Sequence, residues 1–93
     1  MSDKKASECI CIHLDAGHDN NGNPKRAYMV IHTSGDIVAV IDEGYYGSKA
    51  LNKTFGDKIG TDLYLRYSGT IATTKLQLRD LFKDFSEPRY TLI

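Results

Sequence analysis

Two runs of β-branched and aromatic residues, 27–33 (AYMVIHT) and 37–41 (IVAVI), most constrain the fold. Only Ser34, Gly35 and Asp36 separate the runs, and residues of this kind favour a tight turn. The pair therefore predicts a β-hairpin. Apolar side chains occupy both of its faces, so we expect it at the centre of a sheet that is covered on each side. Helices could cover one face and a second chain or sheet the other, so the two apolar faces are a first indication of a dimer.

A strand is also predicted over residues 9–14, because side chains of two kinds alternate along it. One face carries Cys9, Cys11 and His13. The other face carries three aliphatic residues, Ile10, Ile12 and Leu14. We expect the aliphatic face to meet the core and the thiols to lie on a second, partly covered face.

The second half of the chain adds two helix patterns. Ser48 is placed to cap a short helix over residues 49–55, and Thr74 with Gln77 forms a capping box ahead of a longer one. The apolar stripe of the longer helix consists of Leu78, Leu81, Phe82 and Phe85. Residues 62–68 (DLYLRYS) alternate with a period of two and predict a half-buried strand, and residues 89–93 predict a closing edge strand.

Together these elements predict an α+β domain, with a mainly antiparallel sheet of four to five strands and two helices packed on one face. We expect residues 1–7 to be a disordered tail and residues 8–93 to form a single small domain. Twelve basic and twelve acidic residues cancel, which argues against a dedicated binder of nucleic acid or membrane surfaces. No apolar run is long enough for a signal peptide or a membrane span, so we expect a cytoplasmic protein with reduced thiols.

Candidate recognition residues gather after the first strand, in a polar segment that we predict to be a loop over residues 16–26. We expect six of its side chains to contact a partner: His18, Asp19, Asn21, Asn23, Lys25 and Arg26. Tyr45 and Tyr46, followed by Lys49, would add amphipathic contact area. The leading prediction is a small, non-catalytic interaction or regulatory domain that binds a protein partner or forms a homodimer.

Two alternatives remain open at this point. The first is a nucleic-acid-binding module, in which Tyr45 and Tyr46 stack on bases. Its phosphate contacts would come from Lys25, Arg26, Lys49 and Lys53. The second is a metal-dependent, hydrolase-like site around His13 and His18.

A zinc ion in the second alternative would take its ligands from Cys9, Cys11, His13 and His18. The spacing argues against a full set, because residues at i, i+2 and i+4 of one straight strand span about 13 Å and cannot all reach one ion. The leading prediction requires no cofactor.

The string Leu14-Asp15-Ala16-Gly17-His18 resembles the zinc-binding opening of the N-acetylmuramoyl-L-alanine amidases, where an Asp-x-Gly-His stretch supplies the first ligand. Membership of that family would imply a longer chain with a later ligand Glu and a second ligand His. The only later histidine is His32, at the end of the first hairpin run. The likeness covers five residues, and we assign no family from it.

Overall fold

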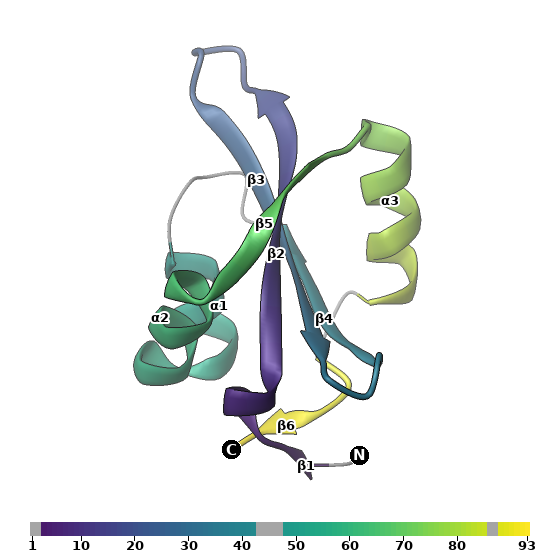
Figure 1. Ribbon diagram of the computed structural model, residues 1–93. Coiled ribbons are helices and arrows are strands. Elements are labelled where there is room, and N and C mark those ends of the chain that lie inside the picture. The colour runs from purple at the N-terminus through teal and green to yellow at the C-terminus, as the bar shows by residue number, and fades with distance from the viewer. Residues whose placement is uncertain (1–2, 43–47, 86–87) are drawn as a thin grey trace.

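A four-stranded sheet forms the middle of the structure, a computed structural model that describes residues 3–42, 48–85 and 88–93 (Figure 1). Its strands lie in the order β4, β3, β2, β5, with these bounds: β2 (Cys9–His18), β3 (Pro24–His32), β4 (Ile37–Asp42) and β5 (Tyr67–Ala72). The pairs β2–β3 and β3–β4 are antiparallel, whereas β5 runs parallel to β2. The α+β class is confirmed, but the sheet is mixed rather than mainly antiparallel. The chain crosses over through two helices before it returns as β5.

Helices cover both faces of this sheet. α1 (Lys49–Phe55) and α2 (Asp57–Leu65) lie together on one face, and α3 (Lys75–Asp84) lies on the other (Figure 1). Two helices therefore share a face, as predicted, but the second of them is α2, and the helix predicted after Thr74 is α3 on the opposite side. The larger apolar cluster lies under α1 and α2 and the smaller one under α3.

The faces of β2 are reversed relative to the prediction. Cys9, Cys11 and His13 point into the larger cluster and its surroundings, with 1%, 0% and 4% of their surface exposed. On the aliphatic face only Leu14 is buried, beside α3, and Ile10 is 39% exposed. The expectation that the aliphatic row meets the main core was wrong, because a strand's own sequence does not reveal which face later helices will cover.

The segment 62–68, predicted as a strand, is divided between α2 and β5. α2 continues to Leu65, and β5 begins at Tyr67. Leu63 is fully buried, but Leu65 is 72% exposed. Ile59 and Leu63, four residues apart, mark the true helical face, so the apparent period of two was misleading.

The hairpin of β3 and β4 is confirmed, with Tyr28 opposite Ile41. Only half of it is central, because β3 lies inside the sheet while β4 is at the edge. Part of that edge is covered, since the backbone N–H of Arg89 donates to the Val38 carbonyl at 3.0 Å. The bare edge of the sheet, among the described residues, is therefore β5.

The two ends of the described chain meet in a small second sheet. β1 (Asp3–Lys4) pairs in parallel with β6 (Thr91–Leu92), at the bottom of Figure 1. The predicted closing strand is thus present but does not join the main sheet. Residues 3–8, which the sequence assigned mostly to a tail, contain β1 and the 3₁₀ turn η1 (Ala6–Glu8).

The capping box at the start of α3 is confirmed. Thr74 Oγ1 accepts the Gln77 N–H at 3.2 Å, and Gln77 Oε1 accepts the Thr74 N–H at 2.9 Å. We expect Thr74→Ala to lower the free energy of unfolding by about 1 kcal/mol, because an N–H of the first turn loses its partner. Urea unfolding followed by circular dichroism measures this change. Lys83→Ala in the last turn of α3 is the matched control, and equal midpoints for the two variants would contradict the prediction.

Candidate functional site

The polar segment 16–26 is mostly strand. β2 continues to His18 and β3 begins at Pro24, so the prediction of a loop over all of 16–26 was wrong. A register shift between Asp15 and His18, with Gly17 at φ 84°, bulges β2 and lets the pairing resume beyond it. Beside the bulge Arg26 Nη1 contacts Asp15 Oδ1 at 3.0 Å, so this predicted binding cation already has an anionic neighbour.

The connection over residues 19–23 uses its polar groups internally. Asp19 Oδ1 accepts the backbone N–H groups of Asn21 and Asn23 at 2.8 and 2.9 Å, and Asn23 Nδ2 donates to Asp19 Oδ2 at 3.3 Å. The bond from the Asn23 N–H is the main reason that the pKa of Asp19 is lowered. These side chains hold the turn together, which leaves fewer of their hydrogen-bonding groups for a partner. His18 is exposed beside it.

The side chains of the nucleic-acid alternative do not form one patch. Lys25 lines a hollow beside α3, whereas Lys49 and Lys53 lie on α1, which covers the opposite face of the sheet. Tyr45 and Tyr46, the predicted stacking residues, lie outside the described residues. A single strand could not contact all three lysines without passing around the domain.

His13 is enclosed by tyrosines from three elements. Its ring stacks on Tyr67 at 4.5 Å and on Tyr64 at 5.0 Å between centroids, and Tyr28 meets it edge-on at 5.0 Å. Its Nε2 has no hydrogen-bond partner among the residues that the structure describes. Burial, and after it the positive charge of Arg26, lowers the pKa of His13. The neutral ring is therefore the form that suits this cage.

The candidate zinc ligands do not converge. Cys9 and Cys11 are buried free thiols, and burial raises the pKa of Cys11 to about 12, so it stays protonated. His13 points into the same interior, but His18 lies exposed at the far end of β2. Within residues 3–42, 48–85 and 88–93, no three His, Cys, Asp or Glu side chains are grouped as metal ligands would be. The zinc alternative therefore lacks a ligand set in that part of the chain.

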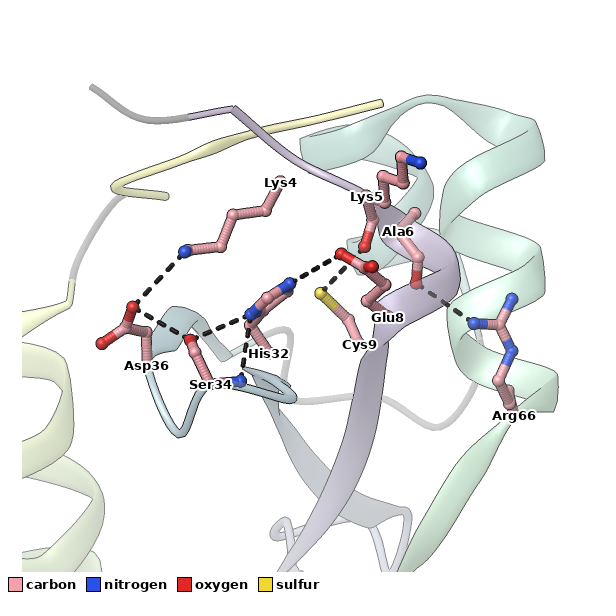
Figure 2. A network of polar contacts seen from close by, with 9 residues as sticks. All are labelled: Lys4, Lys5, Ala6, Glu8, Cys9, His32, Ser34, Asp36 and Arg66. Carbon is pink, nitrogen blue, oxygen red and sulfur yellow. Dashed lines mark hydrogen bonds and ion pairs between the residues drawn. The ribbon is translucent and has the colours of Figure 1, made fainter.

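Figure 2 shows a polar network around His32 that the sequence did not reveal. His32 Nε2 lies 3.0 Å from Glu8 Oε1, and Nδ1 lies 2.9 Å from Ser34 Oγ. Hydroxyl, imidazole and carboxylate in this order are the groups that activate a serine nucleophile. Here Nδ1 also accepts the Ser34 backbone N–H at 3.1 Å, and Ser34 Oγ donates to Asp36 Oδ2 at 3.1 Å. The hydroxyl is thus bonded within its own turn.

The network joins the start of the chain to the turn between β3 and β4. Lys4 Nζ of β1 lies 3.4 Å from Asp36 Oδ2, and Glu8 of η1 reaches His32 (Figure 2). The bond with His32 lowers the pKa of Glu8, and the Ser34 hydroxyl, followed by Lys4, lowers that of Asp36. These contacts hold β1 and η1 against the end of β3 and the turn that follows it, which is a structural role. No signal in the sequence pointed to it, since Glu8 and His32 are 24 positions apart.

The outer edge of β5 is the least covered part of the sheet. Five of its six residues are exposed, and Tyr67 and Ile71 each have 53% of their surface exposed. β5 carries no charged residue and no proline. Beside it, Leu14, Met29, Ile71 and Leu81 help to line an apolar hollow of about 370 Å³.

A second hollow brings together cations from two elements that are far apart in the sequence. Lys75 and Arg79 of α3 line it together with Lys25 of β3. Sequence spacing places Lys75 and Arg79 on one helical face, but it gives no sign that Lys25 lies opposite them.

None of the helices in the described ranges is long and apolar enough to cross a membrane. The chain matches no protein-family model, and the searches found no similar curated protein and no similar solved structure.

Proposed function

We propose that this chain is a small interaction domain of the cytoplasm that forms a homodimer through the edge strand β5. The observation that carries the proposal is the exposed, uncharged edge of β5. The two free, buried thiols suit a reducing compartment.

An open strand edge presents unpaired N–H and C=O groups, and monomeric proteins usually protect such edges with lysine, proline or a covering segment. The other edge of this sheet has such a cover at Val38, where Arg89 bonds to it. Among the described residues β5 pairs only with β2. Its sequence, YSGTIA, contains none of the protecting residues.

A second copy of the chain suits this edge better than a charged partner. An uncharged strand meets its own copy without repulsion, and antiparallel pairing about a two-fold axis would continue the sheet from one subunit into the other. The exposed apolar side chains Tyr67 and Ile71, together with the apolar hollow beside β5, would add buried area to the backbone bonds.

Native mass spectrometry of the reduced protein, over a range of concentrations, tests the proposal. We expect a dimer for the natural sequence and at least about a tenfold weaker dimer for Ile71→Lys, because lysine at a sheet edge opposes pairing and would bring two like charges together. Ile93→Lys is the matched control, since Ile93 is an aliphatic residue with 65% exposure outside the main sheet.

A monomer at every concentration would refute the dimer. A dimer that survives Ile71→Lys but is lost in Ile93→Lys would move the interface to the small β1–β6 sheet. Circular dichroism of both variants tests whether they remain folded, so that loss of the dimer signal can be assigned to dissociation and not to unfolding.

A further inference from the structure

The hollow beside α3, which we call the basic hollow, lies on the face of the sheet opposite α1 and α2. Its volume is about 270 Å³. Three cations and one carboxylate surround it: Lys25 of β3, Lys75 and Arg79 of α3, and Asp42 at the end of β4. Ala16, Leu78 and Phe82 supply its apolar lining.

The cations of the basic hollow are placed unfavourably for an isolated domain. Lys75 is the first residue of α3, where the helix dipole is positive, and the first turn holds no acidic residue. Arg79 is one turn further along the same face, at the i,i+4 spacing at which like charges repel. Neither residue, nor Lys25, forms an ion pair with any residue of the described ranges.

A single anion in the basic hollow would relieve both unfavourable placements and would also give Lys25 an anionic partner. Lysine supplies a compact positive charge and arginine a bidentate hydrogen-bond donor, and both are common in sites that bind a phosphate group. The volume is close to the lower end for small-molecule sites, so the hollow suits a compact ligand.

The remaining lining indicates that the ligand is not anionic along its whole length. Phe82 and Leu78 offer an apolar surface, and the ring of Phe82 can stack on a flat group. Asp42 would repel a second negative charge on its side of the hollow. A molecule with one charged end and one uncharged, partly apolar end satisfies both conditions.

We propose that the basic hollow binds a small organic phosphate, with the phosphate at Lys25, Lys75 and Arg79 and the organic part against Phe82. This inference is independent of the homodimer, because β5 and Ile71 do not line the basic hollow.

The test is a titration of the full chain with adenosine monophosphate, followed by chemical shifts of the backbone amides in low salt. We expect saturable shifts centred on α3 and β3. Arg79→Ala should weaken binding by about tenfold, since it removes a charge-assisted pair of hydrogen bonds. The matched control is Lys83→Ala, an exposed cation of the same helix that does not line the hollow and should bind like the natural sequence.

Three further probes decide what is recognised. Adenosine should bind at least about tenfold more weakly than adenosine monophosphate, because it lacks the phosphate. Inorganic phosphate should also bind more weakly, because it lacks the organic part.

No saturable shift with adenosine monophosphate, or equal affinity in the natural protein and Arg79→Ala, would overturn the proposal. Tighter binding of a short single-stranded oligonucleotide at the same residues would overturn it in favour of a nucleic-acid site. Inorganic phosphate binding as tightly as the nucleotide would reduce the hollow to a simple anion site.

Discussion

Replacing Gly60 by alanine is expected to lower the free energy of unfolding by about 2 kcal/mol. Gly60 of α2 is buried against α1, and a Cβ at this position would overlap the backbone N and Cα of Asn52. Backbone atoms cannot move aside as a flexible side chain does. We expect the overlap to cost about 3 kcal/mol, offset by about 1 kcal/mol from the better helix propensity of alanine.

Urea unfolding in the Ile71→Lys background, at a concentration where native mass spectrometry finds only the monomer, measures this effect without interference from subunit dissociation. Lys58→Ala, an exposed position of the same helix, is the control and should be nearly neutral. Any gain of stability in Gly60→Ala would mean that propensity dominates, and that α1 and α2 do not approach as closely as the structure shows.

The second large effect is a loss of stability when the pH falls below about 6.5, the ordinary pKa of histidine. The pKa of His13 is lowered in the folded state, first by burial and then by Arg26. The unfolded chain therefore binds a proton at a higher pH than the folded chain does. The contribution of His13 to the free energy of unfolding is fully present above about pH 6.5. It falls as the pH drops from there toward the pKa of the folded state, by a total of about 1.4 kcal/mol for each unit by which folding lowers the pKa.

His13→Phe isolates this contribution, because it keeps a ring among Tyr28, Tyr64 and Tyr67 but cannot be protonated. Unfolding free energies of the natural chain should decrease between about pH 7.5 and 5.5, and those of His13→Phe should stay nearly level. Asp19, Asp36 and Glu8 also have lowered pKa values, but they lose their contributions only below the ordinary carboxylate range. An equal slope in both proteins would show that His13 is not the group responsible.

Local patterns in the sequence predicted the parts of the fold that local forces determine. The β3–β4 hairpin and the capping box of α3 follow from turn chemistry and short-range hydrogen bonds. The bounds of α1 are also as predicted, but the expected cap was wrong, because the Ser48 side chain accepts no capping bond from the N–H groups of this helix. The crossover to a parallel β5, and the faces to which Cys11 and Ile10 point, depend on contacts between distant segments. In residues 62–65 two periodicities overlapped, and the helical one determined the structure.

The same limit applies to the candidate sites. Sequence identified Asp19 and Asn23 as polar residues of a connection, but not that they would bond to each other. It identified Lys25, but Lys75 and Arg79 lie on a separate element and reach the same hollow only in the folded chain. The exposed edge of β5 was not visible in the sequence, because only Tyr67 and Ser68 of this strand fell within the predicted strand 62–68.

Hydrogen exchange of the β5 amides tests the central claim, the dimer, most directly. In a homodimer joined through β5, the outward-facing amides of Tyr67–Ala72 become bonded to the second copy. Their protection should therefore rise with protein concentration and disappear in Ile71→Lys, while the amides of β3 inside the sheet stay protected throughout. Rapid exchange along the outer edge of β5 at every concentration would contradict the account.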